Sequence, residues 1–422
     1  MTPVFSRGRL NLMTMILSMA SVSCMEVTPI EQDAGVDSQQ RSLAPCEDGE
    51  HNGGDGYCYP LTECAPSFTL EETGYCARFS PAPALLPARW QNGAAKLDNR
   101  YVMFCGGLSG DSVLDETILF DEDQEIWVNV NRMPHAAHGH ALTRYEGNQV
   151  LVAGGVGDDE EVLANTMLFR GDIGDWIELA PLTVGRTHHG LEYTASGRIF
   201  VFGGLISGGS TTTRIEEFVN DEWIELDSQL RTHRSSMETV LLQDGRIMIV
   251  GGLGQFGETK SSAEILDPTT ALSELTDSMT DERAGHSAIL IDDSRVLVVG
   301  GYVLIGETTN ALRTAEIYDV ETGLWSDTGF LRTPRYGHAM VALEPGVVMV
   351  FGGFSDEQTP LRTTEVYDVQ EGVFLEGASM EQARAYFSAS LLHDGRVLLA
   401  NGVDNGEDLT SLSSAELYEA AR

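Results

Sequence analysis

The stretch RAGHSAILIDDSRVLVVGG, residues 283–301, decides the fold of this 422-residue chain because it is one copy of a recurring unit. Its closing glycine doublet returns at intervals of 48, 49, 48, 49, 52 and 49 residues when a degenerate last copy is counted. The copies stand at Gly106-Gly107, Gly154-Gly155, Gly203-Gly204, Gly251-Gly252, Gly300-Gly301, Gly352-Gly353 and Asn401-Gly402. A fixed period of this length indicates a repeat architecture in which no unit buries its apolar face alone.

Each unit contains four predicted strands. The doublet follows an apolar, β-branched run such as Val296–Val299, which predicts a short buried strand. A tight-turn signal such as Asp244-Gly245-Arg246 precedes several of these runs and indicates a hairpin with an earlier strand. A third strand such as Ala315–Tyr318 and a fourth centred on an aromatic complete the unit. Four antiparallel strands per unit predict the blades of an all-β propeller.

The units also hold register at positions that were not used to find them. The residues seventeen before the first glycine are Arg89, Ala137, Arg186, Arg234, Arg283, Arg335 and Arg384. Those fourteen before it are Asn92, His140, His189, Met237, His286, His338 and Phe387. Six arginines and four histidines in seven units therefore support a true repeat.

This pattern resembles the kelch repeat family of β-propellers from near residue 79 to the C-terminus. Residues 283–325 match it most fully, with Arg283, His286, Arg295, Gly300, Gly301, Glu316, Tyr318 and Trp325. By the same resemblance, Arg186, Arg335 and His338 are structural residues of the repeat. The resemblance implies a fold and not an activity, because one scaffold hosts many functions.

The fourth-strand aromatic usually stands ten residues before the next unit's arginine position. Phe79 stands ten residues before Arg89, and the last unit has no fourth strand of its own. We therefore expect residues 75–80 to form the outer strand of the last of seven blades. Six blades remain the alternative if the degenerate unit packs elsewhere. The fourth unit offers only Leu272 or Leu275 at the aromatic position.

The chain ahead of the propeller has the features of an exported protein. Residues 1–23 combine a basic start with a short apolar run, which is typical of a signal peptide. The segment resembles a bacterial lipoprotein signal, which implies lipidation of Cys24 and a place in the cell envelope. Ordinary cleavage after Ser23 stays open. Residues 24–45 suit a flexible tether.

Four cysteines in residues 46–76 predict a disulfide-stapled segment ahead of the propeller at 77–422. The preferred pairing is Cys46–Cys58 with Cys64–Cys76, because each pair encloses eleven residues and both stretches end in Gly-Tyr. Four cysteines allow three pairings, and a metal site is the weaker alternative since zinc ligands usually come closer together. Cys105 is expected to be a buried hydrophobe.

The charge balance restricts the partners. The chain carries 64 acidic and 26 basic residues, a formal charge of −38. Such a protein repels phosphate backbones and anionic membranes, which disfavours nucleic acid as a partner. Solubility explains the excess, and cation binding by clusters such as residues 158–161 is the alternative.

Topology indicates where a ligand would bind. The loops after the glycine doublets and the loops that join blades emerge on one face, and variable loops on a rigid scaffold usually carry binding. We interpret the arginine and histidine series as structural, with recurring third-strand glutamates as partners of the arginines. The glutamates are Glu216, Glu264, Glu316, Glu365 and Glu416. The candidate ligand-binding residues are Arg89, His135, His138, His188 and His233. The four histidines would bind a metal only if their loops converge.

No nucleophile elbow, phosphate loop or zinc-protease helix is present in the sequence. We therefore expect a lipid-anchored, monomeric, non-catalytic binding module for a protein or glycan, without a cofactor. A carbohydrate-active enzyme with its site at the channel mouth is the alternative. It rests on resemblance to sialic-acid mutarotases and to the central propeller of galactose oxidase. We expect no copper chemistry of the latter type, because its copper site also needs a C-terminal domain.

Overall fold

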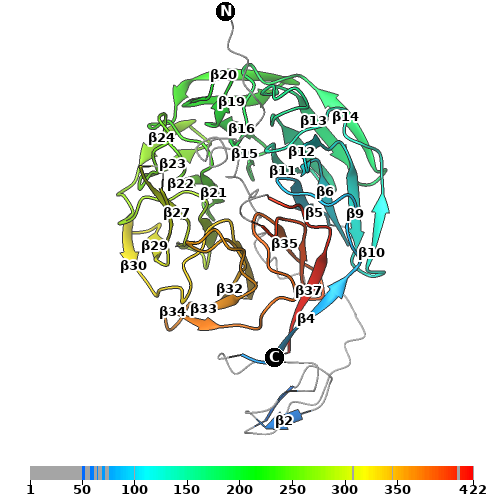
Figure 1. Ribbon diagram of the computed structural model, residues 1–422. Coiled ribbons are helices and arrows are strands. Elements are labelled where there is room, and N and C mark those ends of the chain that lie inside the picture. The colour runs from blue at the N-terminus through cyan, green and yellow to red at the C-terminus, as the bar shows by residue number, and fades with distance from the viewer. Residues whose placement is uncertain are drawn as a thin grey trace, which may run out of the picture.

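The computed structural model describes residues 50–52, 58–60, 64, 69–71, 76–98, 100–306, 308–344, 346–405 and 409–421. In this part of the chain every helix or strand element is a strand, and no helix that could cross a membrane occurs there. The large sheets stand as seven blades around a central axis (Figure 1). The prediction of a seven-bladed, all-β propeller is confirmed, and the six-bladed alternative is wrong.

Each blade is an antiparallel sheet whose strands run in chain order from the axis outward. Blade seven is the exception, because its two outermost strands precede blade one in the chain. From inner to outer, the strands are: blade one, β5 (Gly93–Lys96), β6 (Tyr101–Cys105), β9 (Thr117–Asp121) and β10 (Ile126–Asn129); blade two, β11 (Ala141–Tyr145), β12 (Gln149–Ala153), β13 (Thr166–Arg170) and β14 (Asp175–Leu179); blade three, β15 (Gly190–Tyr193), β16 (Ile199–Phe202), β19 (Arg214–Val219) and β20 (Glu222–Gln229); blade four, β21 (Glu238–Leu241), β22 (Ile247–Val250), β23 (Ala263–Asp267) and β24 (Leu272–Leu275); blade five, β25 (Ser287–Leu290), β26 (Arg295–Val299), β29 (Ala315–Asp319) and β30 (Leu324–Asp327); blade six, β31 (Ala339–Glu344), β32 (Val347–Phe351), β33 (Thr364–Asp368) and β34 (Val373–Glu376); blade seven, β35 (Ser388–Leu391), β36 (Val397–Ala400), β37 (Ala415–Ala421), β4 (Cys76–Ala82) and β3 (Thr69–Leu70).

The two ends of the propeller meet in blade seven. Strand β4 pairs with β37 through seven residue pairs, from Ala415 with Ala82 to Ala421 with Cys76, and Tyr418 lies opposite Phe79. The two strands lie side by side near the C-terminus (Figure 1). The expected closing strand is therefore confirmed, although it is Cys76–Ala82 rather than residues 75–80.

A disulfide ties the closing strand to the segment before it. Cys64 and Cys76 are bonded, with a Cα–Cα distance of 5.7 Å. Ahead of them, β1 (Glu50–Asn52) pairs with β2 (Cys58–Pro60). The expected partner of Cys58, Cys46, lies outside the described residues, as do the signal peptide, the tether and Cys24. Cys105 is a buried free thiol, as expected, and burial raises its pKa to about 12.

The core lies between adjacent blades, and the fourth-strand aromatics bridge them. The ring of Trp176 packs on Phe169 of its own blade at 5.1 Å between centroids. Its indole N–H donates to the Thr117 hydroxyl of blade one at 3.1 Å. Trp223 donates in the same way to Thr166 of blade two. Each tryptophan thus covers its own sheet and links it to the preceding one.

Two blades depart from the pattern of the fourth-strand aromatic, blade three in its spacing and blade four in its residue type. In blade three, Trp223 stands one residue further from the next arginine, and the pairing of β19 with β20 shifts register between Arg214 and Glu216. In blade four the expectation of Leu272 or Leu275 is wrong. Ser273 occupies the aromatic position, opposite Leu266, and its buried hydroxyl donates to the Glu264 carboxylate at 2.7 Å.

Glycine is required at both doublet positions because neighbouring atoms leave no room for a side chain. The first glycine contacts the next blade, and the second contacts its own blade. At Gly300, φ is +60°, and an added Cβ would lie 2.6 Å from the Arg335 carbonyl oxygen and 3.0 Å from the His338 ring of the next blade. At Gly301, φ is +93°, and a Cβ would meet the Ala284 carbonyl and His286 Cβ of its own blade at 2.8 Å. A side chain at either position would be strained and would clash.

The degenerate doublet of blade seven has a matching change in blade one. Asn401 adopts φ +69° at the first glycine position and is fully buried. The residue facing it from blade one is Asn92, where four other blades have histidine. The Asn401 side-chain amide donates to Asn92 Oδ1 at 3.2 Å. Replacing a ring by the shorter asparagine makes room for the second side chain.

Candidate functional site

The blade-joining loops and the loops after the glycine doublets lie on one face, as expected. The residue after each arginine position bridges the residue after its doublet in all seven blades. The bridges are Trp90–Leu108, His138–Val156, Thr187–Leu205, Ser235–Leu253, Ala284–Tyr302, Tyr336–Phe354 and Ala385–Val403. We call this side the doublet face.

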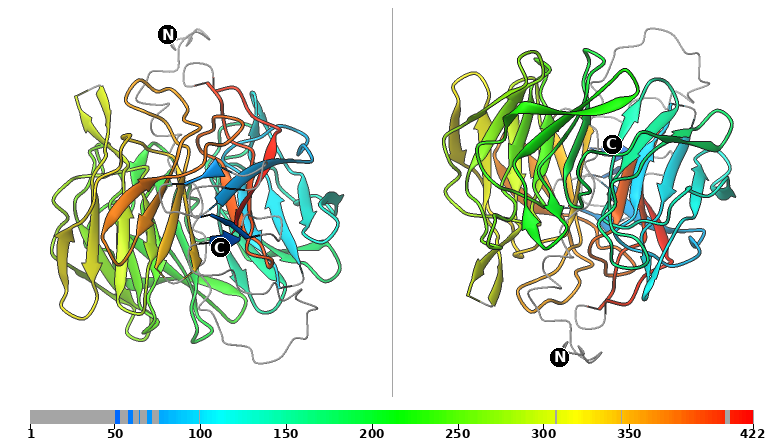
Figure 2. Two further views of the ribbon diagram at one scale, coloured as in Figure 1. Left: turned by 90° about the horizontal axis from the view of Figure 1, so that it is seen from below. Right: turned by 90° about the horizontal axis from the view of Figure 1, so that it is seen from above.

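The loops of the doublet face differ from blade to blade. Blades one, three and five carry two-stranded hairpins: β7 (Leu108–Ser109) with β8 (Ser112–Val113), β17 (Leu205–Ile206) with β18 (Ser210–Thr211), and β27 (Tyr302–Ile305) with β28 (Thr308–Ala311). Blades two, four and six carry shorter turns closed by single bridges, such as Leu253 with Thr259. The β27–β28 hairpin, drawn in yellow, projects beyond its neighbours when the ring is seen edge-on (Figure 2).

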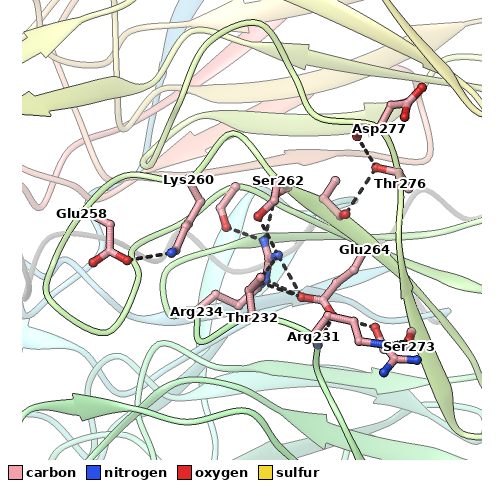
Figure 3. Close-up of polar contacts among 12 residues, drawn as sticks. Arg231, Thr232, Arg234, Glu258, Lys260, Ser262, Glu264, Ser273, Thr276 and Asp277 are labelled. Atoms are coloured by element: carbon pink, nitrogen blue, oxygen red, sulfur yellow. Dashed lines mark hydrogen bonds and ion pairs between the residues drawn. The ribbon is translucent and has the colours of Figure 1, made fainter.

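The repeated arginines are internal braces. Arg234 is fully buried, and its guanidinium donates to the carbonyls of Gly251 at 2.8 Å and Ser262 at 3.0 Å. It also lies 2.8 Å from the Glu264 carboxylate, which accepts the backbone N–H of Arg231 at 2.7 Å (Figure 3). The ion pair therefore fixes the blade-joining loop to the third strand. The expected pairs are all present: Arg186–Glu216, Arg234–Glu264, Arg283–Glu316, Arg335–Glu365 and Arg384–Glu416.

Blade two replaces this brace by apolar side chains. Ala137 and Met167 occupy the arginine and glutamate positions, and both are fully buried in the cluster between blades one and two. A buried ion pair can be exchanged for well-packed apolar residues without loss of stability, whereas losing one partner is costly. The absence of both members in one blade agrees with a structural role for the pair.

Arg89 belongs to the same structural series, which corrects its assignment as a ligand-binding candidate. It is fully buried and donates to the carbonyls of Gly106 at 3.2 Å and Glu116 at 3.3 Å. Its blade has Ile118 at the glutamate position. Among the described residues, Nη2 of Arg89 has no hydrogen-bond partner, and burial lowers its pKa to about 10. Because the side chain has no exposed surface, it cannot contact a ligand in this fold.

The repeated histidines are packing residues held in the neutral form. The rings of His140, His189, His286 and His338 lie against the first glycine of the preceding blade. Burial lowers the pKa of His140 to about 4 and that of His338 to about 3, and it lowers those of His189 and His286 well below 6.5. Met237 and Phe387 fill the same place in two blades, so an uncharged side chain suffices.

These histidines predict a loss of stability in acid. Below pH 6.5 the unfolded chain takes up protons that the folded chain excludes, so stability should fall until the pH reaches the folded-state values near 3 to 4. The variant His338→Phe copies Phe387. Between pH 7 and pH 4.5, we expect its free energy of unfolding to fall by about 1–3 kcal/mol less than that of the parent. Urea unfolding at both pH values measures the difference. An equal loss in parent and variant would contradict this account, and Ser287→Ala serves as a non-titrating control.

Seven residues with a left-handed backbone conformation encircle the axis on the doublet face. All stand two residues after the arginine position, and all have positive φ: Gln91, Gly139, His188, Ser236, Gly285, Gly337 and Tyr386. The N–H of Gly139 donates to the Gln91 carbonyl, that of His188 to Gly139, and that of Ser236 to His188, at 2.9–3.2 Å. The candidate His188 is therefore part of this ring, buried, with its Nδ1 2.8 Å from the Thr187 hydroxyl. Sequence reasoning missed the ring because only its spacing repeats.

The other three candidate histidines lie apart in separate contacts. His135 Nε2 lies 3.6 Å from the Glu178 carboxylate, and His138 Nδ1 lies 2.7 Å from Gln91 Oε1. His233 Nδ1 lies 2.8 Å from the Thr211 carbonyl. Burial lowers the pKa of His138 to about 4. In the described part of the chain, no three His, Cys, Asp or Glu side chains are grouped so that they could hold a metal. A ligand contact by His135, His138 or His233 stays a prediction.

Aromatic side chains pack together where blades five, six, seven and one meet on the doublet face. The ring of Tyr336 lies 5.3 Å from that of Tyr302, 5.5 Å from Phe354 and 6.4 Å from Tyr386, between centroids. Trp90 lies 6.4 Å from Tyr386, and all five side chains are buried. Burial raises the pKa of Tyr302, Tyr336 and Tyr386. The base of these loops is therefore a second, rigid apolar core.

Comparisons with known proteins agree with this geometry. The Kelch motif matches residues 283–328 and 334–381. Similar proteins include Kelch-like protein 40 of Xenopus laevis, 25% identical over 44% of this chain and 30% of that protein. Adagio protein 3 of Arabidopsis thaliana is 26% identical over 43% of this chain and 33% of that protein. Kelch-like protein 38 of Homo sapiens is 23% identical over 62% of this chain and 44% of that protein. The chain thus spans about a third to under half of the length of these relatives.

Two solved structures share the fold at low sequence identity. The structure of YjhT superposes with a TM-score of 0.56 at 14% identity, covering 70% of this chain and 99% of that one. A fungal alcohol oxidase of the AA5 family, in complex with copper, gives 0.66 at 17% identity, covering 81% and 76%. These similarities concern the fold alone. Together with the Kelch motif in blades five and six, the repeat register and the seven blades, they show that the chain has the fold of a kelch-type β-propeller.

Proposed function

We propose that this protein is a non-catalytic binding module that recognises a partner protein through its doublet face. The observation that carries the proposal is that the repeated residues stabilise the scaffold, whereas the loops are free to vary. The repeated arginines and third-strand glutamates are buried in pairs such as Arg283–Glu316, whereas the loops of the doublet face vary in length and sequence among the blades. A rigid frame that presents unlike loops on one side suits recognition. The Kelch motif matches blades five and six, and Kelch propellers are typically protein-interaction modules.

The proposal includes export and a lipid anchor at Cys24. The Cys64–Cys76 disulfide supports export, because structural disulfides persist in oxidising compartments. The basic and apolar residues before Cys24 support cleavage and lipidation there. The protein would then hold its propeller away from a bacterial membrane on the tether of residues 24–45. Mass spectrometry of the mature N-terminus tests this part, and a mature chain that retains residues 1–23 would contradict it.

Selection of binders from a random peptide library displayed on phage tests the binding function. We expect the full chain to select peptides with micromolar affinity, and hydrogen exchange of the complexes to show protection in the doublet-face loops. The turns on the opposite face, such as residues 171–174, should stay unprotected. A glycan array and a screen of sugars for turnover run in parallel. Binding of glycans without peptides, protection confined to the opposite face, or turnover of a sugar would each overturn the proposal.

A further inference from the structure

The loops of blades four, five and six are joined into one surface at their bases. Leu253, Tyr302 and Phe354, the residues that follow the three doublets, are buried in the same apolar cluster. Tyr336 packs between Tyr302 and Phe354. Loops that share a core keep fixed positions relative to one another. We call the described residues of 253–260, 302–311 and 354–360 the loop arc.

Hydrogen bonds above the core also connect the loop arc. The Ala311 N–H in the blade-five hairpin donates to Asp356 Oδ1 of blade six at 2.7 Å. On the other side, the Leu304 N–H lies 3.5 Å from the Thr259 hydroxyl of blade four. The hairpin is therefore fixed to both neighbouring loops. A surface of this kind loses little conformational entropy when a partner binds.

Two large apolar side chains are exposed at the tips of the loop arc. Phe256 of blade four is 82% exposed, and Ile305 of the adjacent blade is 66% exposed. Phe256 stands at the tip of a turn in which its N–H donates to the Glu258 carboxylate at 2.9 Å, and the Gly254 N–H donates to the Glu258 carbonyl at 2.7 Å. The turn fixes the backbone that presents this ring, and aromatic side chains, phenylalanine included, are enriched at protein interfaces. Blade two has the same turn, with Asp159 in place of Phe256.

The exposed charged side chains of the loop arc are negative. Asp356 and Glu357 are exposed in blade six, and Glu258 is exposed beside Phe256. The one cation in the blade-four turn, Lys260, pairs with Glu258 at 2.6 Å. The chain as a whole carries a formal charge of −38. A partner that fits must therefore supply both apolar side chains and positive charge.

We propose that the loop arc docks a segment of a partner protein that combines apolar side chains with lysine or arginine. The inference deepens the proposed function and rests on it. Phe256 and Ile305 supply the apolar contact, and Asp356, Glu357 and Glu258 attract and orient the cationic side chains.

Defined peptides test this chemistry on the full chain. The probes are three synthetic twelve-residue peptides with a fluorescent label: one of leucine and lysine, one of serine and lysine, and one of leucine and glutamate. The variants are Phe256→Ser combined with Ile305→Ser, and Asp356→Asn combined with Glu357→Gln. The matched controls are Ile173→Ser, 59% exposed on the opposite face, and Asp158→Asn with Asp159→Asn, which removes two charges from blade two.

We expect fluorescence anisotropy to show binding of the leucine–lysine peptide in preference to the other two. The apolar double variant should weaken binding about tenfold or more, and the charge variant about three- to tenfold at low salt. The two controls should leave affinity unchanged. Equal binding of the serine–lysine or leucine–glutamate peptide, or an equal effect of the blade-two variant, would overturn the inference. Phage-selected peptides that lack basic residues, or that protect only blades one to three, would contradict the inference about the loop arc. The proposal that the doublet face binds a partner would remain supported.

Discussion

A chain that lacks residues 1–82 is expected to lose the single cooperative unfolding transition of the intact propeller. The deletion removes β4, which contributes seven residue pairs to blade seven, and with it the Arg78–Glu419 ion pair at 2.6 Å. It also removes Phe79, whose ring packs 5.2 Å from that of Tyr418, between centroids. Blade seven would then expose the edge of β37, and the covalent connection that runs from β4 into blade one would be lost. We expect a loss of more than about 5 kcal/mol, comparable to the whole stability of many domains.

Urea unfolding monitored by circular dichroism and tryptophan fluorescence measures the effect. A chain lacking residues 1–45 keeps β4 and the Cys64–Cys76 disulfide, so it should unfold like the parent. Phe79→Ala in the full chain is the intermediate case, with an expected loss of about 3 kcal/mol. If the chain without residues 1–82 keeps one transition at the parental urea concentration, β4 does not close the ring.

Arg283→Ala is expected to destabilise the propeller by about 3–5 kcal/mol, because it leaves the Glu316 carboxylate buried without its partner. The arginine also donates to the carbonyl of Gly300 at 2.7 Å, so the doublet turn loses a bond as well. The double variant Arg283→Ala with Glu316→Met copies Ala137 and Met167 of blade two. It should recover most of the loss, since no buried charge remains.

Chemical denaturation of the parent, both single variants and the double variant gives the coupling energy between the two positions. Exposed pairs such as Arg246 with Asp244 supply the control, because Arg246→Ala should cost less than about 1 kcal/mol. If the double variant is as unstable as Arg283→Ala alone, the loss does not come from an unpaired buried charge, and this account of the ion pair is wrong.

The repeat made the fold predictable, and departures from the repeat limited what else could be predicted. The doublets, the arginine series and Phe79 gave the seven blades and the closing strand because each is set by spacing. Ser273 stands at the aromatic position by spacing, ten residues before Arg283, but the sequence does not show that its hydroxyl binds Glu264 where other blades pack a ring. The register shift between Arg214 and Glu216 in blade three likewise depends on how two strands pair.

The candidate site was less predictable than the fold. Arg89 was singled out because it lacked a glutamate partner, but it makes the same two backbone-carbonyl contacts as the other arginines, and no side-chain pattern reveals these contacts. The histidines were chosen by residue type, and their separation depends on loop paths that the sequence does not encode in a recognisable motif. Phe256 was not predicted as a contact residue, because the sequence of a variable loop does not show whether an apolar side chain is exposed. The repeat thus defined the frame, whereas the contacting residues depended on tertiary structure.

The asparagine pair where blade seven meets blade one has a consequence for how this protein can change in evolution. Asn401 has a side chain where the other blades have glycine, so its neighbour must offer a short group such as Asn92. A blade copied from the histidine-bearing units and inserted at that junction would place an imidazole ring against Asn401. The junction of blades seven and one is therefore less suited than the other junctions, which have glycine at this position, to accept such a copy.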